Sequence, residues 1–88
     1  MSGRHLEMTF RKGRAMAAYL YLPRQSGDHA ASTRPLGQGL VADFAADGRL
    51  IGLEVTDPAR TTLATLNAAL ATLSQAPLSE AEARPLAA

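Results

Sequence analysis

The sequence contains no cysteine and no tryptophan, and it has no long apolar run. The lack of cysteine excludes disulfides and thiolate metal ligands, and it is typical of a reducing compartment. The longest apolar run, residues 15–22, is far shorter than the roughly 20 residues that cross a bilayer. A basic segment precedes this run as in a signal peptide, but no clear cleavage site follows it. We therefore expect a cytoplasmic protein without a membrane span.

Lysine is almost absent, and arginine supplies most of the positive charge, although the net charge is only +1. Residues 1–34 hold five arginines and one lysine against Glu7 and Asp28. Such a basic half can attract nucleic acid or an acidic partner. Because no aromatic residues alternate with these arginines, we interpret the charges as a solvated strand face and expect no nucleic-acid partner.

The familiar catalytic motifs are also missing. The sequence has no nucleophile elbow, no phosphate-binding P-loop and no Cys/His pair. His5 and His29 stand alone, without carboxylates at ligand spacing. The segment Gly37-Gln38-Gly39 resembles part of a dinucleotide-binding fingerprint, but it leads into a strand pattern and is interpreted as a turn. We predict no catalytic residue, no cofactor and no metal site.

What the sequence does contain is enough apolar residues for one modest core. Apolar residues make up 47% of 88 residues, which suits one domain. We place a single α+β domain at residues 1–76, and a short helical turn with a frayed tail at residues 77–88. The predicted fold is an antiparallel sheet of four to five strands followed by a C-terminal helix packed on one face.

The first two predicted strands have different patterns. Leu6, Met8 and Phe10 alternate with polar residues, which predicts a half-buried strand before a turn at residues 12–14. Residues 15–22 are apolar on both faces, which predicts a central strand covered on both sides. Because one helix covers only one face, a second copy of the chain is the simplest cover for the other.

A hairpin is the clearest local signal. Residues 40–44 and 50–55 flank Asp47-Gly48, a pair that favours a two-residue type I′ turn, and a weak edge strand at residues 30–36 precedes them. The predicted register pairs apolar residues on one face, namely Phe44 with Ile51, Ala42 with Leu53 and Leu40 with Val55.

A helix follows the hairpin. Asp57-Pro58 favours a helix start, and Thr61 or Thr62 could cap a later one. The apolar stripe predicts about four turns ended by Pro77, after which Ser79 and Glu82 have the spacing of a capping box. The stripe consists of Leu63, Leu66, Leu70 and Leu73, with Ala69 beside them.

Three groups of residues are candidates for function. Tyr19 and Tyr21 are either anchors for a partner or ordinary strand packing. Asp43 and Glu54 lie diagonally on one face in the preferred register, and with Asp57 they are weak candidates for a polar site. The preferred interpretation is that any sheet displays such polar residues opposite its buried face. Further interaction candidates lie on the helix, at Leu66, Leu70 and Leu73.

The hairpin region resembles the DUF2283 family of small bacterial proteins of unknown function. Residues 37–44 resemble its glycine turn and "V-D-Y" strand, residues 47–55 its "D-G-R" and "G-I-E-I" segments, and Asp57 its final aspartate. Residues 18–22 lie where members have an "A-L-Y-I" strand. The resemblance covers roughly residues 8–60 and implies a mostly β protein with no established activity. Members often carry an acidic pair before the tyrosine strand, where this chain has Arg11, Lys12 and Arg14.

These observations favour a non-enzymatic interaction module that forms a homodimer. The alternative is an antitoxin-like or regulatory partner of another small protein, with the basic half touching DNA. A carboxylate-based enzyme or metal site is the third hypothesis. Nothing in the sequence names a substrate or ligand.

Overall fold

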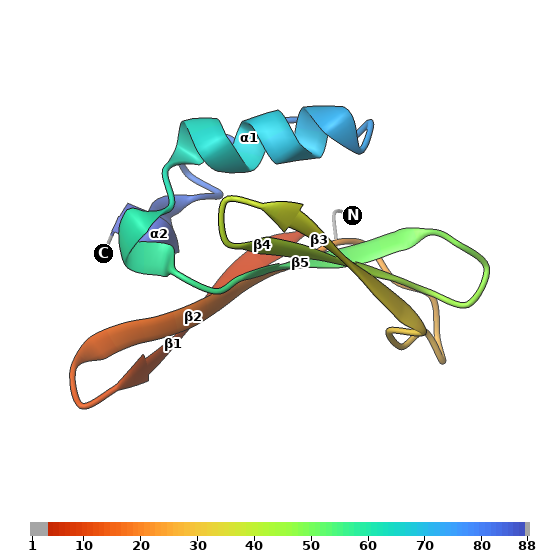
Figure 1. Ribbon diagram of the computed structural model, residues 1–88, viewed down its shortest axis with the longest axis horizontal. Helices are drawn as coiled ribbons and strands as arrows, with labels where there is room; N and C mark the ends of the chain where they lie inside the picture. Colours follow the sequence, from red (N-terminus) through yellow and green to blue (C-terminus); the bar gives the residue numbers. More distant parts are fainter. Residues whose placement is uncertain (1–3, 88) are drawn as a thin grey trace.

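The computed structural model describes residues 4–87 and has a five-stranded antiparallel sheet followed by helices (Figure 1). The predicted α+β class and antiparallel sheet are confirmed. The strands lie in the order β1-β2-β5-β4-β3, so the chain crosses from β2 to β3 before the β4–β5 hairpin fills the centre. The elements are β1 (His5–Arg11), β2 (Arg14–Tyr21), β3 (Ser32–Gly37), β4 (Leu40–Phe44), β5 (Leu50–Val55), the 3-10 helix η1 (Pro58–Arg60), α1 (Leu63–Thr72) and α2 (Arg84–Ala87).

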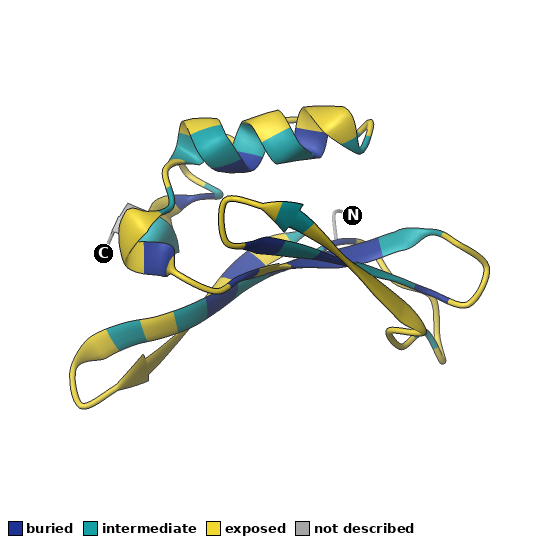
Figure 2. Cartoon of the chain, viewed as in Figure 1, coloured by how far each residue is buried: buried dark blue, intermediate teal, exposed yellow. Residues whose placement is uncertain are grey.

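The core joins α1 to the sheet. Leu20 of β2 and Leu53 of β5 form one buried cluster with Leu66 and Leu70, and none of the four is exposed. In Figure 1, α1 runs above the sheet and Figure 2 shows its buried residues on the side that turns toward the strands. As the sequence predicts, the apolar stripe of the helix packs on the sheet, and water is excluded from the layer of leucines between them.

The helix begins and ends differently from the first prediction. Asp57 precedes only η1 and makes no capping hydrogen bond with its side chain, whereas Thr62 Oγ1 accepts from the backbone N–H of Thr65 at 3.1 Å. The later of the two predicted starts is thus confirmed. The helix has 10 residues, about three turns, and it ends before Ser74, whose φ of 60° lies in the left-handed region. Pro77 therefore follows the helix end and does not cause it.

Residues after Pro77 return to the same core, so α1 is not the C-terminal element. Leu78 and Ala83 are buried in the main cluster. The side chain of Asn67 binds the backbone of Leu78 in both directions, at 2.7 and 3.2 Å. The predicted capping box is confirmed, because Ser79 and Glu82 exchange side-chain to backbone hydrogen bonds at 3.0 and 3.1 Å. The predicted frayed tail includes Ala88, which lies outside the described residues.

Arg4, the first of the described residues, is bound to this returning segment. The guanidinium of Arg4 donates to both carboxylate oxygens of Glu82, at 3.2 and 3.0 Å, and to the carbonyls of Ala76 and Pro77. The Arg4 guanidinium also holds the pKa of Glu82 below its usual value. Residues far apart in the sequence are thereby joined beside the first strand.

Two of the three residue pairs predicted for the β4–β5 hairpin are confirmed. Ala42 faces Leu53 and Leu40 faces Val55, but Phe44 faces Leu50, so the predicted pair of Phe44 with Ile51 is wrong. The turn has one more residue than predicted, because only Gly48 adopts positive φ (92°) and its N–H donates to the carbonyl of Ala45 at 2.9 Å. A bulge that leaves Ile51 without a partner then restores the predicted register.

Candidate functional site

The two faces of the sheet are covered unequally. The helices of the described residues lie on one side of it (Figure 1), and the opposite side, here called the open face, carries polar and aromatic residues. The strand pairings align His5, Tyr21, Gly52 and Asp43 in one row across β1, β2, β5 and β4. The sequence predicted that β2 is covered on both sides. Within the described chain, other elements cover only one of these sides.

Tyr19 lies across this row because residue 52 is glycine. A Cβ atom built on Gly52 would overlap the ring and hydroxyl of Tyr19. Gly52 is buried beneath that ring, and it has no positive φ that would itself require glycine. The missing side chain thus lets the tyrosine lean over β5 and reach β4.

The hydroxyl of Tyr19 uses both of its hydrogen-bonding roles. It donates to Oδ2 of Asp43 at 2.7 Å and accepts from Nη2 of Arg24 at 3.1 Å. Burial and the Asp43 carboxylate raise the pKa of Tyr19 well above its usual value. The phenol therefore stays protonated at physiological pH, which makes it a poor base or nucleophile and a well-fixed hydrogen-bonded anchor.

Aromatic and cationic side chains complete the site. The rings of Tyr19 and Tyr21 meet edge to face with centroids 4.7 Å apart, and the His5 ring stacks on Tyr21 at the same distance. The guanidinium of Arg24 lies 5.9 and 5.3 Å from the two tyrosine ring centroids. These contacts hold the rings in place. We call this group the tyrosine cluster: His5, Tyr19, Tyr21, Arg24 and Asp43.

The predicted carboxylates separate into two places. Asp43 and Glu54 lie on the open face as the register predicts, since Asp43 faces Gly52 and Val41 faces Glu54. Asp57 lies beyond the end of β5, where it pairs with Arg60 at 3.7 Å. Among residues 4–87, no three His, Asp or Glu side chains are grouped so that they could hold a metal ion.

The predicted helix residues have another place in the molecule. Leu66 and Leu70 are fully buried in the core, and Leu73 is half-buried against it. Their side chains fill the space between helix and sheet, while Tyr19 and Tyr21 remain half-buried at the open face. The structure thus leaves the tyrosines, and not the leucines, available to a partner.

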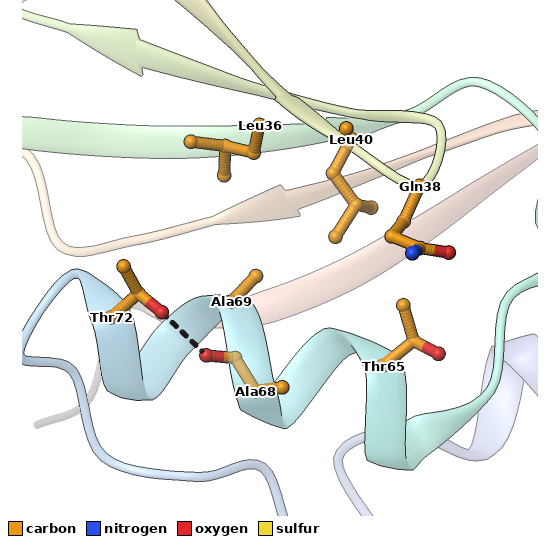
Figure 3. A pocket seen from close by; sticks show the side chains of 8 residues that line it. Leu36, Gln38, Leu40, Thr65, Ala68, Ala69 and Thr72 are labelled. Carbon is orange, nitrogen blue, oxygen red and sulfur yellow. Dashed lines mark hydrogen bonds between the residues drawn. The ribbon is translucent and has the colours of Figure 1, made fainter.

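A neutral cleft lies between α1 and the β3–β4 turn (Figure 3). Its volume is about 370 Å³. Thr72 donates its hydroxyl to the carbonyl of Ala68, so that hydroxyl is already used within the helix. The lining is apolar or uncharged. The cleft therefore has fewer groups that could recognise a ligand than the tyrosine cluster has. It is lined by Leu36, Gly37, Gln38, Leu40, Thr65, Ala68, Ala69 and Thr72.

Sequence reasoning missed three contributors to the site: His5, Arg24 and Gly52. His5 was interpreted as standing alone, and Arg24 was one of the five arginines in the basic half of the chain, with no role of its own. The one available signal was a glycine inside the apolar strand 50–55, since an isolated strand glycine marks a bulge or a close approach.

Comparison with known proteins gives no relative: no family model, curated protein or solved structure matches the chain. Within residues 4–87, no helix is both long enough and apolar enough to cross a membrane.

Proposed function

We propose that this chain is a small, non-enzymatic protein-interaction module that self-associates through the open face of its sheet, and that it acts in the cytoplasm. The observation that carries the proposal is the tyrosine cluster, a rigid aromatic patch on the face opposite α1. The resemblance of residues 8–60 to the DUF2283 family assigns no activity, so the proposal does not depend on it.

The composition of the open face supports binding. Tyrosine and arginine are enriched among the residues that dominate protein interfaces. Tyr19, Tyr21 and Arg24 are already ordered by mutual contacts, so less side-chain entropy is lost when a partner docks. A face of this kind is suited to recognition and not to proton transfer, because the Tyr19 hydroxyl is already engaged on both sides.

We propose that a second copy of this chain binds to the open face. The open face carries the acidic residues Glu7, Asp43 and Glu54 together with the basic Arg24. A two-fold axis brings the same patch against itself, so a patch with both signs of charge can pair with its own copy. A chain of 88 residues also buries a modest core, and association adds to its stability.

The test is the solution mass across a concentration series, from low micromolar to several hundred micromolar, by light scattering coupled to size-exclusion chromatography. We expect a dimer that dissociates on dilution. Tyr21→Glu places a charge on the open face, and we expect it to weaken the dimer by at least about tenfold, as a lost aromatic anchor does.

Ala71→Glu is the matched control, because Ala71 is exposed on α1. It adds the same charge away from the open face and is expected to leave the dimer unchanged. A monomer at every concentration would contradict self-association and direct the search to a different protein partner. Equal weakening by both variants would show that the open face is not the interface.

A further inference from the structure

The β1–β2 hairpin extends beyond the rest of the sheet. β2 pairs with β5 only from Ala18 to Tyr21, so its earlier residues pair with β1 alone. Figure 1 shows this end projecting from the molecule, and Figure 2 shows it mostly exposed. We call residues 9–17 the arm.

The tip of the arm concentrates positive charge. Arg11, Lys12 and Arg14 are all exposed, and residues 9–17 contain no acidic residue. Within the described chain, none of the three has a hydrogen bond or ion pair from its side chain. The tip is therefore an uncompensated cationic group on a narrow support.

The arrangement at the tip is itself unfavourable. Arg11 and Arg14 are directly opposite each other across the two strands, and like charges at such positions destabilise a hairpin. Lys12 also adopts a φ of 54°, a region that side chains other than asparagine and aspartate seldom occupy. An anionic ligand removes the repulsion between the two guanidinium groups, so the geometry points to a ligand with several negative charges.

The arm also carries the large exposed apolar residues of the described chain. The exposed fractions are 53% for Phe10 and 49% for Met16. Both lie within two residues of a tip arginine in the sequence. The arm therefore offers a ligand both positive charge and apolar surface.

We propose that the arm binds double-stranded nucleic acid, with its cations on the phosphate backbone. The sequence alone led us to expect no nucleic-acid partner, but that expectation rested on the lack of the stacking aromatics that single strands require, and a duplex does not need them. The major groove of B-DNA admits a two-stranded β-ribbon and lies between two rows of phosphates. Guanidinium groups bind phosphate oxygens in pairs, and Phe10 can contact a thymine methyl group. The arm is convex and narrow, which fits a groove better than the broad surface of an acidic protein. This surface is separate from the tyrosine cluster, so the proposal stands independently of self-association.

The experiment measures binding of the full chain to a short fluorescent mixed-sequence DNA duplex by anisotropy, across a salt series. Three phosphate contacts per chain predict that log K falls against log salt with a slope of about −3. The double variant Arg11→Gln/Arg14→Gln is expected to bind at least about tenfold more weakly and to have a slope of about −1. Because these residues are exposed and repel each other, its thermal midpoint is expected to stay equal or rise.

The matched control is Arg34→Gln/Arg60→Gln, which removes the same charge from two exposed residues outside the arm. We expect this control to bind as the unmodified chain does. Absence of binding at the lowest salt, or equal loss in both double variants, would overturn the proposal. Poly-glutamate that competes as well as unlabelled duplex would overturn it too, in favour of an acidic protein partner.

Discussion

At the scale of single residues, the open face depends on a contact between the smallest side chain and one of the largest. Gly52 provides the space in which the Tyr19 ring lies, and Asp43 fixes the hydroxyl at the far end. Tyr19 is directly opposite Glu54, so its ring reaches Gly52 diagonally, and Asp43 is directly opposite Gly52 on the next strand. Any side chain at position 52 therefore acts first on Tyr19.

Gly52→Ala is predicted to destabilise the protein although alanine suits a strand better than glycine does. The new Cβ atom overlaps the Tyr19 ring, so the ring must swing away and lose its hydrogen bond to Asp43. The ring is half-buried and can move, so the expected cost is about 1 kcal/mol, the net worth of the lost hydrogen bond. Urea unfolding, followed by circular dichroism, measures the change in the free energy of unfolding.

The control is the same substitution in a Tyr19→Ala background. Without the ring, the methyl group has space, and the cost of Gly52→Ala should disappear or reverse. An equal cost in both backgrounds would mean that the clash with Tyr19 is not the cause.

At the scale of secondary-structure elements, two threonines and one aspartate precede α1, and only Thr62 caps it. Thr62→Ala removes the side-chain oxygen that accepts from the Thr65 N–H, and we expect a loss of about 1 kcal/mol in the free energy of unfolding. Asp57→Ala is the matched comparison, since Asp57 makes no capping bond to η1. Chemical denaturation of both variants gives the test, and a larger loss for Asp57→Ala would contradict the assignment of the cap.

The same element shows how far the sequence predicts the fold. The leucine stripe gave the buried face of α1 because its spacing matches the helical period. The first residue of α1 was ambiguous because Asp57-Pro58 and Thr62 are both good capping sequences. Which of them caps the helix depends on where β5 ends. The turn at Asp47-Gly48 was predicted at the right place but one residue too short. The side chain of Asp47 accepts from the N–H and Nε of Arg49, which stabilises the longer loop.

The candidate site was less predictable than the fold. Tyr19 and Tyr21 were found because they alternate along one strand, and Asp43 because it follows the register of the hairpin. Arg24 and His5 could not be found in that way. Their places depend on the order of strands and on the path of the β2–β3 loop, and neither quantity is encoded in a local pattern.

At the scale of the whole molecule, the two ends of the described chain stabilise each other and the sheet. Arg4 reaches across to Glu82 and to two carbonyls before Leu78, which is itself buried in the core. The segment after Pro77 thus belongs to the same packed unit as the strands. Its removal should expose part of the leucine cluster and leave Arg4 without its ion pair to Glu82.

A chain that ends at Ala76 is accordingly predicted to be less stable by about 2–5 kcal/mol, the usual cost of losing a buried leucine side chain. A chain that ends at Leu86 keeps Leu78, Ala83 and Glu82, and it is the matched control with unchanged stability. Thermal and urea unfolding of the two chains give the comparison, and Leu78→Ala in the full chain should reproduce most of the loss. If the chain that ends at Ala76 unfolds like the control, the core is complete without the returning segment, and the burial of Leu78 contributes little to the fold.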